Sequence, residues 1–265
     1  MSDTGAASVT IADSTLRVSP AALGGWERAA NGTWEPATLA AIDELITEGS
    51  VFVDVGAYVG IVSGLALLRG ATVHAFEPDP VALESLRVME RENADLAARL
   101  TIHPLALGVG NSTMTLSSDT LGNSGSSLVR KGPQSVEVEV RDMRSVLTEA
   151  PLDRCDVIKI DVEGAEYALL PHVWDYLLQR RPALILSTHT YFVRERLLGL
   201  PRLIRGPLFR LLAIPRQLRL LPKLAALGDV AIDDGGAWRA CDRAELRRLA
   251  LHVGEKEFLI RPRSA

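Results

Sequence analysis

The sequence has 265 residues, a formal net charge of −4 at pH 7, two cysteines, and hydrophobic residues at 47% of its positions. This length and apolar content predict one α/β domain that spans residues 1–265. The net charge offers nucleic acid no overall attraction. Cys155 and Cys241 lie far apart and form no CxxC motif, which argues against a disulfide scaffold or a zinc site and favours a reducing cytoplasm.

The first 34 residues are rich in Ala, Gly, Ser and Thr, and we expect a loosely structured lead-in that Trp26 and Trp34 anchor by packing. The N-terminus has no basic region followed by an apolar run, and no apolar stretch reaches the ~20 residues needed to span a bilayer. We therefore expect a cytoplasmic protein that is not exported. Pro36 begins a helix with apolar residues at helical spacing, and Gly49 ends it.

From residue 51 the sequence alternates short apolar runs with amphipathic segments. VFVDV, ATVHAFE, LTIHPLAL, CDVIKID and PALILST are predicted strands, and the segments after residues 60, 78 and 165 are predicted helices. This alternation predicts a mostly parallel sheet that is covered on both faces. Residues 112–141 depart from it and predict a hairpin with a Gly/Ser/Asn-rich connection. Near the end, VAID and CDRAELRRLALH predict a strand and a helix, and EKEFLIRP suits an antiparallel edge strand.

The turn after the first of these strands, DVGAYVG, combines an acid with two glycines. Gly56 and Gly60 allow a tight turn and a close approach of the backbone to a ligand. Tyr58 and Ile61 stand where a dinucleotide fingerprint needs glycine, which disfavours a nicotinamide-dependent oxidoreductase, and no GK[ST] follows to indicate a nucleoside triphosphate. Asp54 would repel a pyrophosphate but attract a ligand with positive charge, such as S-adenosylmethionine.

A second acid supports this cofactor. Glu77 ends the second strand, about 20 residues after the turn, where a carboxylate can accept hydrogen bonds from both ribose hydroxyls. Structural alternatives remain open for both acids: Asp54 would cap a helix, and Glu77 would cap the helix that begins at Asp79 or pair with a surface arginine.

Five segments carry a resemblance to a known family: VFVDVGAYVG, HAFEPDPVALESLRVMERENA, HPLALGVGNSTMTL, NSGSSL and VIKIDVEGAEYALL. In this order, over roughly residues 34–190, the chain resembles the FkbM-type S-adenosylmethionine-dependent methyltransferases. The resemblance implies a class I methyltransferase fold, which is a Rossmann-like, doubly wound seven-stranded sheet with an antiparallel last strand. It also implies methyl transfer to a hydroxyl oxygen of a small-molecule or glycan acceptor.

The resemblance assigns cofactor contacts to named positions. Pro78 shapes the turn after the ribose-binding acid, the third strand ends along the adenine, and the serines of NSGSSL, Ser124, Ser126 and Ser127, lie near the methionine end unless they form only a flexible turn. The full set of implied cofactor residues is Asp54, Gly56, Ala57, Tyr58, Gly60, Glu77, Pro78, Ala106, Leu107, Ser126 and Asp161.

Asp161 and Glu163 follow the buried strand VIKID, beside the same cleft. Methylation of a hydroxyl requires a group that takes its proton or a metal that acidifies it. Asp161 is our first candidate for this role, and Glu163 is the second. The alternative is that Glu163 caps the helix beginning at Gly164 and that Asp161 only binds the amino group of the cofactor. Lys159 is expected to be architectural.

His189 follows the fifth strand at the same edge of the sheet and is the other candidate base. It would also join Asp161 in binding a divalent ion such as Mg²⁺. Many members of the resembled family have an acid close to this histidine, whereas this chain has Ser187, Thr188 and Thr190, so metal binding stays open here. A histidine that makes only a structural hydrogen bond is the alternative.

Residues 191–228 form a basic, leucine-rich insertion after the fifth strand, and four prolines are expected to break residues 194–228 into short helices. We favour a lid over the acceptor. The alternatives are a contact in a homo-oligomer, a patch resting on an anionic membrane, and helices packed on the domain with arginines in solvent. An alternative function for the whole protein is non-catalytic: a protein of this fold that binds a membrane or a partner through residues 194–228.

Overall fold

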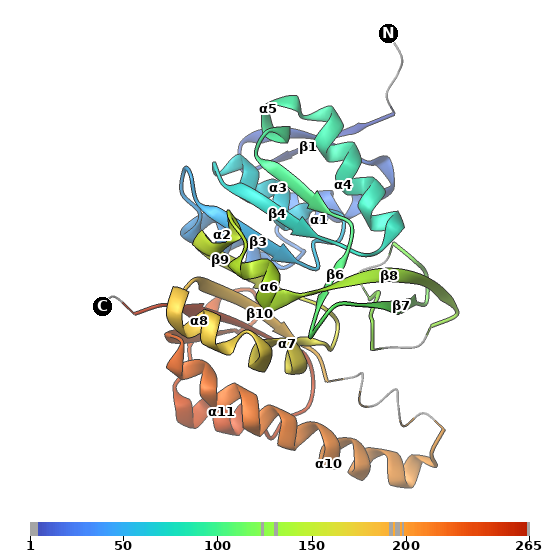
Figure 1. The fold of residues 1–265 in the computed structure, drawn as a ribbon, viewed down its shortest axis with the longest axis vertical. Coiled ribbons are helices and arrows are strands. Elements are labelled where there is room, and N and C mark those ends of the chain that lie inside the picture. The colour runs from blue at the N-terminus through green and yellow to red at the C-terminus, as the bar shows by residue number, and fades with distance from the viewer. Residues whose placement is uncertain are drawn as a thin grey trace.

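Eight strands form the central sheet of the protein, which we describe from a computed structural model (Figure 1). The structure describes residues 5–122, 125–129, 132–190, 193, 197 and 199–263. From one edge to the other, the strands are β12, β11, β13, β10, β9, β3, β4 and β5. Their bounds are β3 Val51–Val55, β4 Thr72–Phe76, β5 Leu100–His103, β9 Val157–Ile160, β10 Ala183–Thr188, β11 Asp229–Asp233, β12 Trp238–Ala240 and β13 Lys256–Arg261.

The strand directions confirm the predicted fold class. β3 pairs in parallel with both β4 and β9, and β9 pairs in parallel with β10, whereas β13 runs antiparallel to both β10 and β11. Without β12, the order is that of the expected seven-stranded sheet, and the three-residue β12 adds an eighth strand at one edge. Strand order reverses between β3 and β9, so the ligand crevice is expected at their carboxyl ends.

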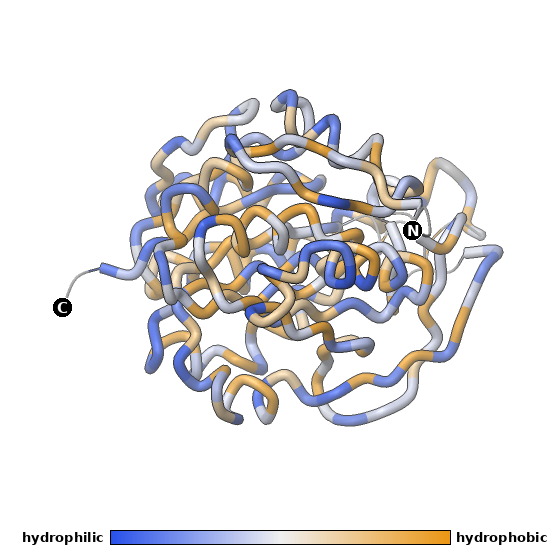
Figure 2. The backbone as a smooth tube through the Cα atoms, turned by 90° about the horizontal axis from the view of Figure 1, so that it is seen from above, coloured by the Kyte–Doolittle hydropathy of each residue, from blue (hydrophilic) through white to orange (hydrophobic). Residues whose placement is uncertain are grey.

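Helices cover both faces of the sheet because its central strands are apolar on both sides. Every residue of β9 and β10 is buried. Helices α2 to α4 pack on one face, helices α6 to α8 and α11 pack on the other, and hydrophobic residues concentrate in the middle of the molecule (Figures 1 and 2). The bounds of these elements are α2 Pro36–Leu45, α3 Ile61–Leu68, α4 Pro80–Glu92, α5 Ala94–Ala97, α6 Met143–Thr148, η2 Leu152–Arg154, α7 Glu166–His172, α8 Trp174–Arg180 and α11 Arg243–Leu249.

The predicted hairpin excursion is present as a separate three-stranded sheet. β7 (Ser112–Ser118) pairs antiparallel with β8 (Gln134–Asp142), and β6 (Ala106–Gly108) pairs in parallel with β8. In Figure 1 this small sheet lies beyond the carboxyl ends of β3 and β4. It therefore extends the wall of the crevice.

The N-terminal segment differs from the expectation of a loosely structured lead-in. Residues 7–30 form the hairpin β1 (Ala7–Ile11) and β2 (Ser14–Val18), the short η1 (Pro20–Ala22) and helix α1 (Leu23–Ala30). The reason is burial, since Leu16 and Trp26 enter the main core against α3 and α4. The expectation that Trp26 anchors the segment is confirmed.

The insertion also differs from the sequence prediction. Residues 202–220 form one 19-residue helix, α10 (Arg202–Leu220), which contains Pro207 and Pro215 and continues into η3 (Leu221–Ala226). Both prolines lie on the exposed side, where water can hydrate the carbonyl groups that each proline leaves without a donor. Among the described residues, no helix combines the length and hydropathy needed to cross a membrane.

Candidate active site

A cavity of about 540 Å³ opens at the carboxyl ends of β3 and β9, where strand order reverses. Loops that follow β3, β4, β9 and β10 supply its walls, together with the small sheet and the start of α2. The structure thus brings together most of the predicted site residues. Those that line the cavity are Gly56, Ala57, Tyr58, Glu77, Pro78, Ala106, Leu107, Ser126, Asp161, Glu163 and His189.

The glycine turn brings the loop after β3 into contact with the loop after β9. Gly56 has a φ of +85°, and a Cβ at this position would overlap the carbonyl oxygen of Asp161. Gly60, with a φ of +88°, does not line the cavity; a Cβ there would lie 2.5 Å from Leu86 Cδ2. Gly60 therefore has a packing role, because it lets α3 approach α4, while its contact with the cofactor stays a prediction.

Glu77 is buried in the cavity wall and organises two turns. Its Oε2 accepts the backbone N–H of Tyr58 and its Oε1 accepts that of Asp79, both at 2.7 Å. Burial raises the pKa of Glu77 to about 7, although these two hydrogen bonds favour the ionised form. Each oxygen keeps a lone pair, so Glu77 can still accept hydrogen bonds from a ligand.

Asp79 was predicted only as the start of a helix, but it also holds the NSGSSL loop. Its Oδ1 caps α4 through the N–H of Val81 at 2.9 Å, and its Oδ2 accepts from the Gly122 N–H and the Ser126 hydroxyl, both at 2.7 Å. Ser126 is thereby positioned at the cavity. Ser127 donates instead to the Glu163 carbonyl at 2.8 Å, and Ser124 lies outside the described residues.

Asp54 is buried behind the residues that line the cavity, and its contact with the cofactor stays a prediction. Its Oδ2 accepts from the Ser63 hydroxyl at 2.7 Å, its Oδ1 lies 3.9 Å from Lys159 Nζ, and burial raises its pKa. Lys159 in turn lies 3.3 Å from Asp161 Oδ2 and does line the cavity. Lys159 was expected to be architectural, but it also has an electrostatic role, because its ammonium group lies between the carboxylates of Asp54 and Asp161.

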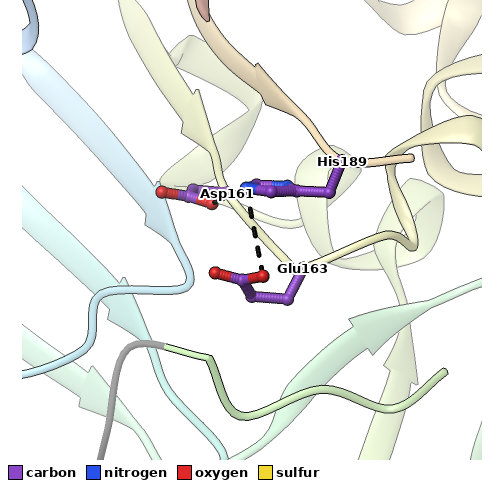
Figure 3. A group of neighbouring side chains, drawn as sticks. All are labelled: Asp161, Glu163 and His189. Carbon is purple, nitrogen blue, oxygen red and sulfur yellow. Dashed lines mark ion pairs between the residues drawn. The ribbon is translucent and has the colours of Figure 1, made fainter. Parts of the chain in front are cut away.

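The ends of β9 and β10 bring Asp161, Glu163 and His189 together (Figure 3). His189 Nε2 lies 3.8 Å from Asp161 Oδ1 and 3.9 Å from Glu163 Oε2. On the other side of the ring, Nδ1 donates to Glu166 Oε1 at 2.8 Å. β9 and β10 are adjacent parallel strands, so the residues that follow them meet at one edge of the sheet.

The three side chains of this cluster have different pKa shifts because their surroundings differ. Burial opposes protonation of His189, but the hydrogen bond to Glu166 and the surrounding carboxylates raise its pKa to about 10. Burial raises the pKa of Glu163 to about 8. Burial also opposes ionisation of Asp161, yet the charges of Lys159 and His189 hold its pKa below the usual value. At neutral pH Asp161 is therefore an ionised carboxylate beside a protonated His189, whereas Glu163 largely keeps its proton.

Sequence reasoning missed two acids at this site. Glu166 is fully buried, and its Oε1 also accepts the backbone N–H groups of Val162 and Gly164, so it positions both His189 and the loop after β9. Glu35, just before α2, also lines the cavity, and burial raises its pKa to about 8. The EGAE motif contained Glu166, but no spacing rule connects either acid with the fifth strand.

The trio fits a divalent cation. One ligand atom from each of Asp161, Glu163 and His189 lies within 4.8 Å of the others, and within the described structure Asp161 Oδ1 and Glu163 Oε2 are buried without a hydrogen-bond partner. The Nδ1 bond to Glu166 also leaves Nε2 on the side of the cluster, as in a metal-binding histidine oriented by a carboxylate. The two acids of this group lie in the loop that follows β9, and the histidine follows β10.

The predicted lid is not seen in the described part of the insertion. No residue among 193, 197 and 199–228 lines the cavity. Residues 191, 192, 194–196 and 198, which connect β10 to this region, lie outside the described residues.

Comparisons with known proteins identify a methyltransferase family. The family described as Methyltransferase FkbM domain matches residues 54–211. A solved methyltransferase FkbM from Methylobacillus flagellatus KT is 22% identical with a TM-score of 0.40, and the match covers 54% of this chain and 33% of that chain. A search of curated proteins returned no match.

Two other solved structures align over more of the chain. Precorrin-6y C5,15-methyltransferase from Geobacter metallireducens GS-15 is 12% identical with a TM-score of 0.39, covering 85% of this chain and 87% of that one. A SAM-dependent methyltransferase from Agrobacterium tumefaciens is 10% identical with a TM-score of 0.43, covering 98% of this chain and 71% of that one. The family match, which spans the glycine turn, Glu77 and the Asp161 cluster, shows that the chain belongs to the FkbM family of S-adenosylmethionine-dependent methyltransferases.

Proposed function

We propose that the protein is an O-methyltransferase that acts on a hydroxyl of a sugar, a glycolipid or another hydroxylated natural product. The observation that supports this most directly is Asp161, an ionised acid whose Oδ1 is buried at the cavity without a hydrogen-bond partner among the described residues. A hydroxyl must lose a proton when it is methylated, whereas a neutral amine can attack with its own lone pair. A proton acceptor at this position therefore favours oxygen as the methylated atom.

The residues of the cavity fit S-adenosylmethionine, which supplies an electrophilic methyl group together with sulfonium and ammonium charges. Glu77 would accept from the ribose hydroxyls, and Ala106 and Leu107 would provide the apolar surface for the adenine. Gly56 lets the backbone approach the ligand closely. The acidic wall near Asp161 would stabilise the two positive charges.

A second group of lining residues supports a hydroxylated acceptor. Trp34, Glu35 and Glu257 line the cavity, and Glu257 Oε2 accepts from the Thr38 hydroxyl at 3.2 Å. Glu35 Oε2 is buried and has no hydrogen-bond partner among the described residues. An indole beside carboxyl groups suits a sugar ring, which offers an apolar face and several hydroxyl donors.

Asp161 would accept the hydrogen bond of the acceptor hydroxyl and then its proton. Lys159 and His189 hold this carboxylate in place and in its ionised state, and Glu166 fixes the ring of His189. Alignment of the hydroxyl oxygen with the methyl group would supply most of the rate, and Asp161 the deprotonation. If the enzyme uses a metal, Asp161, Glu163 and His189 would hold Mg²⁺ or a similar ion, which would acidify the hydroxyl.

The test is a methylation assay with labelled S-adenosylmethionine and a panel of hydroxylated acceptors, with the product identified by mass spectrometry. At saturating S-adenosylmethionine, where weaker cofactor binding does not limit the rate, Asp161→Asn should lower kcat by roughly 10²- to 10⁴-fold. The matched control is Asp95→Asn, which changes an exposed acid on α5 and should leave turnover normal. Chelation followed by Mg²⁺ addition would show metal dependence if turnover is lost and then restored.

Two outcomes would contradict the proposal. Methyl transfer to amines or thiols, with hydroxyls left unmodified, would reject oxygen as the acceptor atom. Near-normal turnover of Asp161→Asn on a confirmed hydroxyl acceptor would reject Asp161 as the base. The family match disfavours both the oxidoreductase and the non-catalytic alternatives.

A further inference from the structure

Helix α10 has an inner face that packs on the protein. Ala213, Gln217 and Leu220 are buried on this face. Phe209 and Ala213 belong to a small apolar cluster that includes Tyr167 and Val253, which neighbour the site residues Glu166 and Glu255 in the sequence. In Figure 1, α10 lies along the outside of the molecule, beside α11. Gln217 on this face also accepts a hydrogen bond at 3.0 Å from Nζ of Lys256, which lines the cavity, so the inner face of the helix lies close to the site.

The opposite face of α10 is also apolar, but it is exposed. Ile204, Leu211 and Leu218 are 54%, 67% and 41% exposed. They are spaced seven residues apart, and at about 100° per residue they share one side of the helix, opposite Ala213. Leu203, at 91% exposure, extends the same surface. A stripe of large apolar side chains on an outer helix face indicates a binding surface.

Positive charge surrounds this stripe. The sequence has no Asp or Glu between Glu195 and Asp229, although the whole chain carries a net charge of −4. Next to the C-terminal end of α10 is a groove of about 540 Å³, and none of its described lining residues is acidic. This basic groove is lined by Leu218, Arg219, Pro222, Lys223, Arg243, Arg247, Arg248 and Leu251.

The cations of the basic groove are available to a ligand. Its four arginines and its lysine are exposed, and within the described structure none has a carboxylate at ion-pair distance. The nearby Glu245 is engaged instead by Arg239, with Nη2 and Oε1 2.8 Å apart. Unpaired cations beside exposed leucines are complementary to a partner that has an anionic surface and an apolar interior.

We propose that the outer face of α10 and the basic groove bind an anionic lipid bilayer. The leucines would enter the boundary between headgroups and acyl chains, and the arginines would contact lipid phosphates, as in amphipathic helices that lie in the membrane plane. A second copy of the chain fits poorly, because a two-fold interface would place this positive surface against itself. Nucleic acid would match the charge but leave the leucines in water. Binding would hold α10, whose inner face contacts the cavity residue Lys256, against the bilayer, whatever the methyl acceptor is.

The test is co-sedimentation of the full chain with vesicles of phosphatidylcholine alone and of phosphatidylcholine mixed with phosphatidylglycerol. Wild-type protein should bind the mixed vesicles and dissociate at high salt, because screening weakens the charge attraction. Arg247→Glu with Arg248→Glu should lower the partition coefficient by at least roughly 25-fold, since each cation near an anionic surface contributes roughly fivefold. Leu211→Ser with Leu218→Ser should lower it at least tenfold, by removing buried apolar area.

Matched controls change the same residue types away from this surface. Arg87→Glu, on the exposed side of α4, and Val109→Ser, after β6, should bind the mixed vesicles like wild type. Unchanged S-adenosylhomocysteine binding would show that each variant is folded. Failure of folded wild-type protein to bind mixed vesicles, equal binding to neutral vesicles, or equal losses in the controls would overturn the proposal. So would binding to duplex DNA through the same arginines without binding to vesicles.

Discussion

At the scale of single residues, two buried cations control the acids of the site. Lys159 lies between Asp54 and Asp161, and His189 lies between Asp161, Glu163 and Glu166. Fewer positive charges than acidic groups are available, so some acids keep a proton at neutral pH while others stay ionised. Because the positive charges are shared unequally, Asp161 is ionised, whereas the pKa of Glu163 is raised to about 8.

Glu77 provides a prediction about cofactor affinity and pH. Its pKa of about 7 means that it is ionised above neutral pH, where both oxygens can accept from ribose hydroxyls, and protonated below, where one oxygen becomes a donor. Wild-type affinity for S-adenosylhomocysteine should therefore fall as pH is lowered through this value. Glu77→Gln should bind roughly tenfold more weakly at higher pH, because it loses a hydrogen bond to a charged group.

Calorimetric titration on both sides of this pKa measures the effect, and the difference between wild type and Glu77→Gln isolates the contribution of this carboxyl. Glu84→Gln, which changes an exposed acid on α4, is the control. An identical pH dependence in wild type and Glu77→Gln would rule out Glu77 as its source. Equal affinity of the two proteins at high pH would rule out its contact with the ribose.

At the scale of elements, the contact between the loops after β3 and β9 determines the shape of the cavity. Gly56 was predicted for close approach to a ligand, but its backbone also lies against the carbonyl group of Asp161. A backbone carbonyl cannot rotate away as a side chain can. The glycine therefore couples the cofactor turn to the residue proposed as the base.

Matched glycine substitutions test this coupling. Gly56→Ala should lower the free energy of unfolding by about 3 kcal/mol, because φ is positive and the added methyl group meets fixed backbone. Gly24→Ala, at an exposed position of α1 where an added methyl group would meet nothing within 4 Å, should raise it by about 0.5–1 kcal/mol. Urea unfolding measures both, and equal effects of the two substitutions would contradict the assigned contact.

At the scale of the whole molecule, the N-terminal hairpin and α1 belong to the main core. Trp26 is 1% exposed, and a Cβ on Gly64 of α3 would lie 2.5 Å from its ring. Leu16 reaches the same glycine from β2. The segment before α2 is therefore expected to unfold together with the sheet.

Trp26→Ala tests whether the N-terminal segment unfolds together with the sheet. The substitution should lower the free energy of unfolding by about 3–5 kcal/mol, because it leaves a large cavity in the core. Trp174→Ala on α8 should cost less, since that side chain is partly exposed. Urea unfolding followed by fluorescence and by circular dichroism would give one coincident transition. An early separate transition, or a loss below that of Trp174→Ala, would show that the segment is peripheral.

The sequence alone predicted the alternation of strands and helices from β3 to β10, because hydrophobic periodicity is a local property, although LTIHPLAL, predicted as one strand, is divided between β5 and β6. It also placed Glu77, Asp161 and His189 at one edge of the sheet, since parallel strands end on the same side. It did not reveal the first hairpin, whose turn at Ala12 and Asp13 has positive φ at both residues without the usual Asn-Gly signal. Composition alone made this segment resemble a loose lead-in.

Only the tertiary structure decided which side chains reach the cavity. Asp54 and Lys159 lie in adjacent parallel strands, yet the cation lines the cavity and the acid lies behind it. Glu35, just before α2, and Glu166, at the start of α7, both belong to the site although they are far apart in the sequence. Helix α10 continues through two prolines that lie on its exposed side. The physical reason is that burial, charge pairing and contact depend on segments far apart in the chain, which local spacing does not bring together.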